Sequence, residues 1–322
     1  MAVELGSGIR DCLTRSTSPL SGLLCRRYPR RIVRQSMSWE TSCVRVTVIG
    51  AGRIGEALVA GLCRAGTSAE SITVIGRNME RTFAVAHRHG VRVADMRNLP
   101  EECDVLVVAV KPQQIEDVLP GLGVALHGST RRPVVVSVVA GVATSRIEQF
   151  LPSVVPVVRA MPNTPMTVGA AVTAIAAGAA ATEHDLRLVE SVLESVGEVL
   201  RVPEGQLDAV TAVSGSGPAY VFLVAEMMID AAMTLGLDRA TADRLVTGTL
   251  AGSSAMLGDT DPVDLRAAVT SPAGTTAAAL EVFEQSDIRQ TFRGALTAAR
   301  DRSMELSGIV RPPLAPASAD QR

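Results

Sequence analysis

The stretch from Val44 to Leu58 constrains the fold more than any other part of the chain. Alternating β-branched residues predict a short strand, glycines follow at Gly50, Gly52 and Gly55, and an amphipathic helix comes next. In such a G-x-G-x-x-G turn the first glycine permits a tight bend, the second leaves room for a pyrophosphate, and the third lets helix and strand pack closely. The stretch predicts a dinucleotide-binding turn, and the alternative is a glycine-rich turn with a structural role alone.

Strand and helix patterns alternate from this turn to residue 203. Apolar strands are expected at 71–75, 104–110 and 134–139, and the second of these is apolar on both faces, as a central parallel strand should be. This alternation predicts a doubly wound, Rossmann-type parallel sheet that gathers ligands at the carboxyl ends of its strands. Residues 204–310 read as helical throughout, so the predicted fold class is α/β with a C-terminal all-helical domain.

One helix of this second domain is unusually apolar. It starts at Pro218, after residues 214–217 (SGSG) that are expected to break the preceding helix, and only Glu226 and Asp230 interrupt its apolar surface. A small domain cannot bury such a helix alone, which predicts a subunit interface. An ordinary core helix is the alternative.

Composition excludes several classes of protein. A net charge of −2 and an aromatic content of 2% give no case for nucleic-acid binding. No uncharged apolar run is expected to span a membrane. The five cysteines are scattered, and His87 and His89 should point to different sides of a helix as solvated residues, so no metal site is predicted.

The two ends of the chain differ from the rest. Residues 1–43 carry seven arginines against three acids and show no periodicity. They are expected to be a disordered extension, or a mis-assigned one with Met37 as the true start, while their composition also permits an organelle transit peptide. Residues 311–322 are expected to be a flexible tail.

Two basic residues point to the cofactor. The second strand ends in Arg77 and Asn78, where an NAD-binding fold usually has an acid for the ribose 2′-hydroxyl. Arg77 can instead pair with a 2′-phosphate, which favours NADP and leaves NAD possible. Lys111 is the only lysine in the chain and follows a central strand, where the nicotinamide half of a cofactor would lie.

A second informative stretch runs from Val269 to Thr276. Small residues, hydroxyls and a proline lead into a helix whose first N–H groups could bind a small carboxylate. The alternative is a helix N-terminus capped by Ser271 or Thr275. Hydride transfer from a reduced nicotinamide needs mainly positioning of the acceptor, and for a protonated cyclic imine a hydroxyl near the ring nitrogen could suffice.

Five motifs together carry a resemblance to one family. They are IGAGRIG at 49–55, AVKPQ at 109–113, RAMPNTP at 159–165, AVSGSGPAY at 212–220 and VTSPAGTT at 269–276. With these motifs in this order, the chain resembles the pyrroline-5-carboxylate reductases. The resemblance implies NADPH-dependent reduction of 1-pyrroline-5-carboxylate to L-proline. A cytoplasmic location is expected. The resemblance also implies a Rossmann domain at 44–203 and a helical dimerisation domain at 204–310, in dimers that often assemble into decamers.

The same resemblance assigns the site residues. The N–H groups of Thr275 and Thr276 would hold the substrate carboxylate, and the Thr276 hydroxyl would act catalytically at the ring nitrogen. Ser271 and Gly274 complete the substrate loop. The expected cofactor contacts are Ile49, Gly50, Ala51, Gly52, Arg53, Ile54, Gly55, Arg77, Asn78, Ala109, Val110, Lys111, Pro112, Ala140 and Asn163.

The sequence departs from the family pattern in two places. Ala273 stands where the family usually has glycine, and Met96 stands where an asparagine often lies near the cofactor, with Asn98 slightly later. Two other functions stay open. A β-hydroxyacid dehydrogenase would need a lysine in its helical domain, which has none. A non-catalytic NADP sensor would not need the 269–276 loop. A related cyclic imine also remains open as the substrate.

Overall fold

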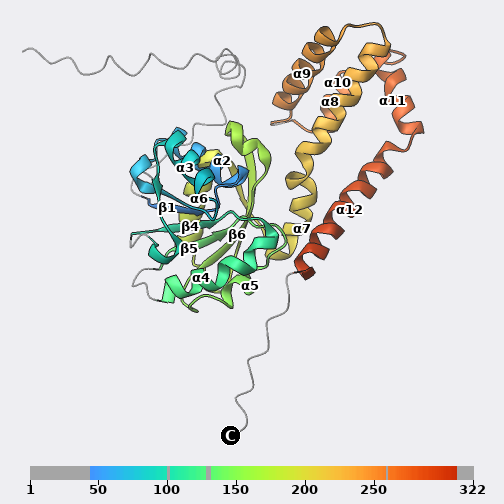
Figure 1. Cartoon of the computed structure of the whole chain (residues 1–322). Coiled ribbons are helices and arrows are strands. Elements are labelled where there is room, and N and C mark those ends of the chain that lie inside the picture. Colours follow the sequence, from blue (N-terminus) through green and yellow to red (C-terminus); the bar gives the residue numbers. More distant parts are fainter. Residues whose placement is uncertain (1–43, 100–101, 128–131, 259, 310–322) are drawn as a thin grey trace, which may run out of the picture.

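The structure is a computed structural model that describes residues 44–309 except 100–101, 128–131 and 259. The expected N-terminal extension at 1–43 and the expected tail at 311–322 therefore lie outside the described residues. Figure 1 shows a sheet domain joined to a separate set of long helices.

The described part of the sheet domain holds one eight-stranded sheet in the order β3-β2-β1-β4-β5-β6-β7-β8. The strands are β1 (Val46–Ile49), β2 (Ile72–Ile75), β3 (Arg92–Val93), β4 (Val105–Val108), β5 (Val134–Ser137), β6 (Val157–Met161), β7 (Ala171–Ala177) and β8 (Gly197–Arg201). Neighbouring strands run parallel from β3 to β6, as predicted, and β7 turns antiparallel to β6. The reason is the short η5 turn (Thr164–Val168) between them, because a parallel return needs a longer crossover.

Helices cover both faces of this sheet. Helices α2 (Arg53–Arg64), α3 (Met79–His89) and α6 (Glu183–Leu193) pack on one face, and α4 (Ile115–His127) and α5 (Thr144–Glu148) on the other (Figure 1). Along β4, Val105 and Val107 face the first layer, whereas Leu106 and Val108 face the second, and all four side chains are fully buried. Burial on both faces explains the unbroken apolar run of this strand, and the predicted doubly wound architecture is confirmed.

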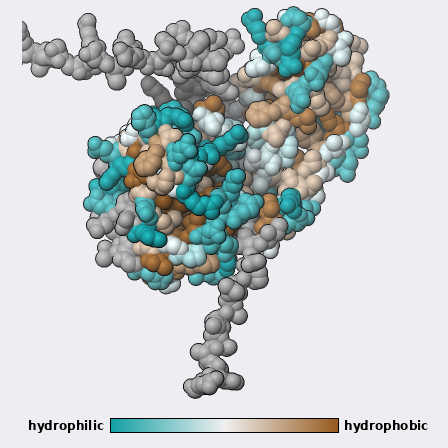
Figure 2. Space-filling view, viewed as in Figure 1, coloured by the Kyte–Doolittle hydropathy of each residue, from teal (hydrophilic) through white to brown (hydrophobic). Residues whose placement is uncertain are grey.

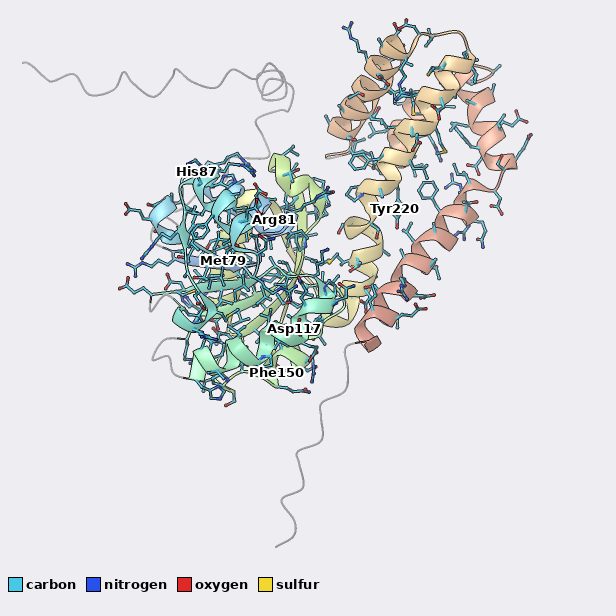
Figure 3. The ribbon with its side chains drawn as sticks, in the orientation of Figure 1. Met79, Arg81, His87, Asp117, Phe150 and Tyr220 are labelled. Carbon is cyan, nitrogen blue, oxygen red and sulfur yellow. The ribbon has the colours of Figure 1, made fainter. Side chains whose placement is uncertain are left out.

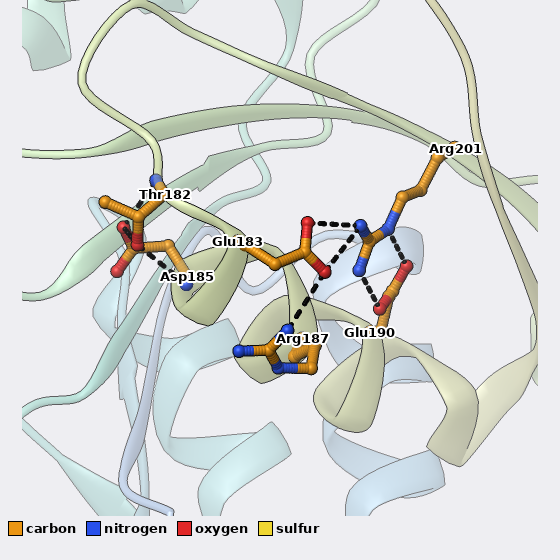
Figure 4. A network of polar contacts seen from close by, with 6 residues as sticks. All are labelled: Thr182, Glu183, Asp185, Arg187, Glu190 and Arg201. Carbon is orange, nitrogen blue, oxygen red and sulfur yellow. Dashed lines mark hydrogen bonds and ion pairs between the residues drawn. The ribbon is translucent and has the colours of Figure 1, made fainter.

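The edge strand β8 is tied to α6 by charged side chains. Arg201 donates to both carboxylate oxygens of Glu183, at 2.8 and 2.7 Å, and also contacts Glu190 (Figure 4). Thr182 caps the same helix by accepting from the backbone N–H of Asp185 at 3.3 Å. These contacts lie at the surface and fix the last strand of the sheet before the chain enters the helical domain.

After β8 the chain forms η7 (Glu204–Gln206) and α7 (Leu207–Val210). A π-helical turn at Thr211–Gly215 then leads into α8 (Gly217–Thr234). The remaining helices are α9 (Arg239–Met256), α10 (Pro262–Ala268), α11 (Thr275–Gln285) and α12 (Ile288–Ile309).

The expected helix break at 214–217 is only partly correct. The chain widens into the π turn and bends at Ser216, and Tyr220 closes the bend by donating its hydroxyl to the Ala212 carbonyl at 3.1 Å. A wide turn of this kind keeps α7 and α8 joined as one path while changing its direction (Figures 1 and 3).

The root of the helical domain packs against the sheet domain. Leu207 is fully buried with Ala174 and Ala176 of β7, and the far end of α12 returns to this point, where Ser303 donates to Asp208 at 2.7 Å. A domain boundary at 203/204 stays a prediction, because residues on its far side share this small core.

The surface of the helical lobe (α8–α12) is strongly apolar. Within one chain α8 has no fully buried residue, and Phe222 is 67% exposed. Figure 2 shows apolar residues over much of this lobe, interspersed with polar ones. One described stretch, Glu204–Thr234, is long and apolar enough to cross a membrane by length and composition alone, although it carries charged residues, and only 6% of its most apolar window is buried. An exposed apolar surface of this size marks an interaction site.

Candidate active site

The glycine turn has the geometry that its sequence predicts. Gly50 has a φ of +117°, and a Cβ at this position would collide with the Ala109 carbonyl oxygen. A Cβ at Gly55 would collide with the carbonyl oxygen of Gly50, so α2 packs directly on the turn. Both positions therefore need glycine for structural reasons.

Gly52 differs from the other two glycines. A Cβ there would have only the Ala109 carbonyl oxygen within 4 Å, at 3.9 Å, so the space beside Gly52 is open. Gly52 is also the N-cap of α2, and no side chain of the described residues caps this helix. Open space in front of uncapped N–H groups suits a pyrophosphate, so the turn fits a dinucleotide.

The strand register brings the other predicted cofactor residues to the carboxyl ends of the parallel strands, beside the glycine turn. This side of the sheet is called the cofactor edge. Ile49 is level with Ile75 of β2 and Val108 of β4, and Ser137 of β5 is level with Val108 and with Arg159 of β6. The segments that leave these strand ends contain the predicted cofactor residues Arg77, Asn78, Ala109, Val110, Lys111, Pro112, Ala140 and Asn163. The structure thus gathers residues far apart in sequence along one edge of the sheet.

Two asparagine side chains and one arginine side chain at this edge already have partners within the chain. Asn78 caps α3 by accepting from the Arg81 backbone N–H at 2.9 Å, and Asn163 accepts from the Val172 N–H at 3.0 Å. Arg77 is 78% exposed, and its guanidinium lies 3.8 Å from the carboxylate of Asp117 in α4. Sequence reasoning missed Asp117, which carries no local signal because it is one of many surface acids on helices.

The other polar and apolar side chains at this edge are open to solvent. Lys111 and Arg53 are exposed, and Ile54 is 36% exposed although it shares a helical face with the buried Leu58. Ile54 stands in the first turn of α2, beyond the packed layer. Its position therefore fits a contact with a ligand over the turn better than a place in the core.

The 269–276 loop ends in an open helix N-terminus. Helix α11 starts at Thr275 with Gly274 as N-cap, and no described side chain caps it, so the alternative of a cap by Ser271 or Thr275 is wrong. A Cβ at Gly274 would lie 2.5 Å from the Ser271 hydroxyl, which explains the glycine. Thr276 is half-buried in the first turn.

Ala273 adopts a left-handed backbone with a φ of +57°. Only glycine enters this region without a steric cost from Cβ, so the alanine that departs from the family pattern is held in a strained conformation. The methyl group of Ala273 thus stands at a turn whose backbone conformation favours glycine.

The two halves of the site lie apart within one chain. Figure 1 shows α11 toward the far end of the helical lobe, separated from β1 and the glycine turn by the length of α7 and α8. A substrate at Thr276 would therefore not reach a cofactor at Gly52 of the same chain. A second subunit must bring the two together if they serve one reaction.

The histidines do not form a metal site. Among the described residues, no three His, Cys, Asp or Glu side chains converge as metal ligands. His87 is exposed as predicted, but the prediction of a solvated His89 is wrong. Its Nε2 is buried without a hydrogen bond and lies 3.7 Å from Glu56, because the end of α3 packs against α2.

These features define a class of protein. The Rossmann-type sheet with an open glycine turn, the arginine at the end of β2 and the apolar helical lobe are those of an NADP-dependent oxidoreductase that works as a homo-oligomer.

Comparisons with known proteins narrow this class. Residues 204–306 match the family model described as pyrroline-5-carboxylate reductase dimerisation, and residues 45–141 match the one described as NADP oxidoreductase coenzyme F420-dependent. The pyrroline-5-carboxylate reductase of Corynebacterium melassecola is 43% identical over 264 residues, covering 81% of this chain and 98% of that protein. That of Mycobacterium tuberculosis H37Rv is 43% identical over 284 residues, covering 81% and 96%.

Comparison with solved structures leads to the same family. The pyrroline-5-carboxylate reductase of Coxiella burnetii has a TM-score of 0.76 and 38% identity, covering 82% of this chain and 98% of that one. The Plasmodium falciparum pyrroline carboxylate reductase, solved with NADP bound, has a TM-score of 0.73 and 28% identity, covering 83% and 99%. The chain belongs to the pyrroline-5-carboxylate reductase family.

Proposed function

We propose that this chain reduces 1-pyrroline-5-carboxylate to L-proline with NADPH, the last step of proline synthesis, at a site shared by two subunits. The observation that carries the proposal is the pairing of an open glycine turn with an open helix N-terminus on separate domains. Family membership supports the substrate and the cofactor.

The cofactor edge holds NADPH by its phosphates. Backbone N–H groups at Arg53, Ile54 and Gly55 face the open space beside Gly52, and the positive end of the α2 dipole stabilises negative charge there. Arg77 lies where the 2′-phosphate would sit, and Ala109 to Pro112 border the nicotinamide. When bound, NADPH supplies the hydride for the C=N carbon.

The substrate loop holds the imine acid. The uncapped N–H groups of Thr275 and Thr276 bind the carboxylate, with Ser271 and Gly274 shaping the loop. The Thr276 hydroxyl then orients and polarises the ring nitrogen, and water supplies the proton. This assignment of roles requires no strong acid or base among the side chains, because the protonated imine is already electrophilic.

The Thr276 role has a direct test. Thr276→Ala should lower kcat at least tenfold while the Kd for NADPH, measured by nicotinamide fluorescence, stays within about twofold, as expected for an interaction made with substrate alone. Thr276→Ser keeps the hydroxyl and should retain most of kcat. An unchanged kcat in Thr276→Ala removes this hydroxyl from the mechanism.

A homodimer places the Thr276 loop of one subunit beside the cofactor edge of its partner. Mixing two impaired variants tests this arrangement. A dimer that combines Thr276→Ala with a Gly52→Ala subunit defective in cofactor binding would contain one site with both functional halves. Equal mixing after reversible dissociation should restore about a quarter of wild-type activity, since half the dimers are mixed and each has one working site of two. No restoration in verified mixed dimers would mean that each chain completes its own site.

The reaction itself is tested by mixing the protein with NADPH and 1-pyrroline-5-carboxylate. Loss of nicotinamide absorbance should match proline formed. NADPH binding without turnover would revive the non-catalytic NADP sensor, and turnover of a hydroxy acid would favour the β-hydroxyacid dehydrogenase alternative. The six-membered imine analogue, run in parallel, measures substrate specificity.

The proposed working form is a cytoplasmic homodimer that assembles further, up to a decamer, and that binds neither nucleic acid nor membrane. The apolar surface of α8 supports a protein partner, because a second copy of the lobe can cover it. Sedimentation at several protein concentrations tests the assembly, and a vesicle-flotation assay tests membrane binding of the apolar Glu204–Thr234 stretch.

A further inference from the structure

A carboxylate lies at the carboxyl ends of the parallel strands, where the cofactor is proposed to bind. It comes from a helix, and not from the residues directly after a strand. Arg77 leaves β2 and Asp117 lies in the first turn of α4, which follows β4, and their charged groups are 3.8 Å apart. Strands β2 and β4 flank β1 on its two sides. The pair therefore spans the strand that ends in the glycine turn.

The position of Asp117 is fixed by the packing of its helix. Ile115 and Leu119 are fully buried against the sheet, two residues before and after Asp117, and this sets the rotation of α4. Asp117 consequently points outward and is 70% exposed. Figure 3 labels Asp117 on α4 and Met79 at the start of α3, and Arg77 precedes Met79 by two residues in the sequence. The neighbouring Glu116 is engaged elsewhere, at 2.6 Å from Arg146.

We propose that Asp117 sets the cofactor preference of this enzyme by competing with the NADPH 2′-phosphate for Arg77. The inference rests on the proposed cofactor site. Without cofactor, Asp117 pairs with the guanidinium. A 2′-phosphate must displace this carboxylate from the guanidinium, and this competition weakens NADPH binding.

NADH meets the same pair differently. NADH carries a 2′-hydroxyl in place of the 2′-phosphate. In NAD-binding folds this hydroxyl donates a hydrogen bond to a carboxylate, which usually lies at the end of the second strand. Here the tertiary structure supplies that carboxylate from α4. Asp117 therefore narrows the difference between the two cofactors, disfavouring NADPH and accepting NADH.

The test measures Kd for NADPH and for NADH by fluorescence of the reduced nicotinamide, without substrate, in the full-length protein. Asp117→Asn should tighten NADPH binding about two- to fivefold, the range expected for an exposed ion pair at low salt, and should leave NADH binding unchanged or weaker. Glu70→Gln is the matched control. It removes the same charge from an exposed residue in the turn before β2, at the opposite edge of the sheet, and should change neither Kd.

A double-mutant cycle identifies the mechanism. In an Arg77→Gln background, Asp117→Asn should no longer tighten NADPH binding, because the guanidinium for which the carboxylate and the 2′-phosphate compete is absent. A gain that persists without Arg77, or a gain equal to that of Glu70→Gln, overturns the proposal. If wild-type protein binds neither cofactor, the proposed function fails, whereas binding of both with an unchanged ratio in Asp117→Asn rejects only the role of Asp117.

Discussion

The guanidinium of Arg159 lies 3.6 Å from the carboxylate of Glu204, across the junction between the two domains. Arg159 belongs to β6 and is only 6% exposed, whereas Glu204 is the first residue of η7, which follows the sheet. Glu204 also accepts from the backbone N–H and the hydroxyl of Thr144, at 2.7 and 2.8 Å. One carboxylate thus ties the sheet, the start of α5 and the root of the helical lobe together.

Glu204→Gln should destabilise the protein by about 1.5–3 kcal/mol, because Arg159 stays buried with a weakened set of partners. Asp208, at 3.8 Å, is the other acid near Arg159 and limits the loss. Urea unfolding measures the effect. Glu284→Gln, which breaks an exposed pair with Arg289, is the control and should cost less than about 1 kcal/mol. If the free energy of unfolding falls equally in the two variants, the Glu204 contacts at the junction do not stabilise the protein more than an exposed ion pair does.

The glycine turn predicts two different outcomes for the same substitution. Gly50→Ala should impair folding, because Gly50 has a positive φ and a Cβ would collide with Ala109. Gly52→Ala should leave the melting temperature within about 2 °C but weaken NADPH binding at least tenfold, because its methyl group fills the space for the pyrophosphate. Thermal melts with NADPH titration measure both. A stable Gly52→Ala protein with normal NADPH affinity would show that the cofactor lies elsewhere.

Ala273→Gly should stabilise the protein by about 0.5–1 kcal/mol, since the left-handed backbone at a φ of +57° no longer opposes a Cβ. The same substitution inside a helix has the opposite sign. Ala278→Gly in α11 should destabilise by about 0.5–1 kcal/mol. Denaturant midpoints of the two variants and the wild type decide the matter. A loss of stability in Ala273→Gly would mean that the backbone of Ala273 is not strained.

Phe222→Asp should dissociate the homo-oligomer into monomers and abolish turnover, because a charge in the centre of the α8 surface cannot be covered by a second copy. Light scattering measures the mass, and NADPH fluorescence should still report binding by the intact sheet domain. Val124→Asp introduces the same charge on α4, where Val124 is 77% exposed, and should change neither mass nor activity. An oligomer that survives Phe222→Asp would place the interface away from this face of α8.

The Glu183 carboxyl should titrate at unusually low pH. Hydrogen bonds from Arg201 hold the pKa of Glu183 below its ordinary value. The folded pKa is therefore lower than the unfolded one, so the contact stabilises the protein above the unfolded pKa and is lost as the pH falls through the folded pKa. Carboxyl chemical shifts in an NMR titration measure this. Arg201→Gln should return the pKa toward the ordinary value, and an unchanged pKa would assign the shift to another cause.

Local sequence patterns predicted most of the sheet domain. Strands β2, β4 and β5 lie within the expected ranges 71–75, 104–110 and 134–139, and a helix follows the glycine turn as expected. These features depend on neighbours within a few residues, so periodicity reveals them. The reversal of β7 and the π turn at Thr211–Gly215 depend on how the chain packs, and the pattern did not indicate them.

The sequence by itself determined the glycine turn, the βα alternation, the arginine at the end of β2 and the family motifs, because each is a short run with its own physical meaning. Only the tertiary structure decided that Arg77 meets Asp117, that Glu204 joins Arg159 to Thr144, and that the Thr276 loop lies far from the glycine turn of its own chain. Contacts between distant segments follow from strand order, helix rotation and domain placement, and no local pattern encodes these.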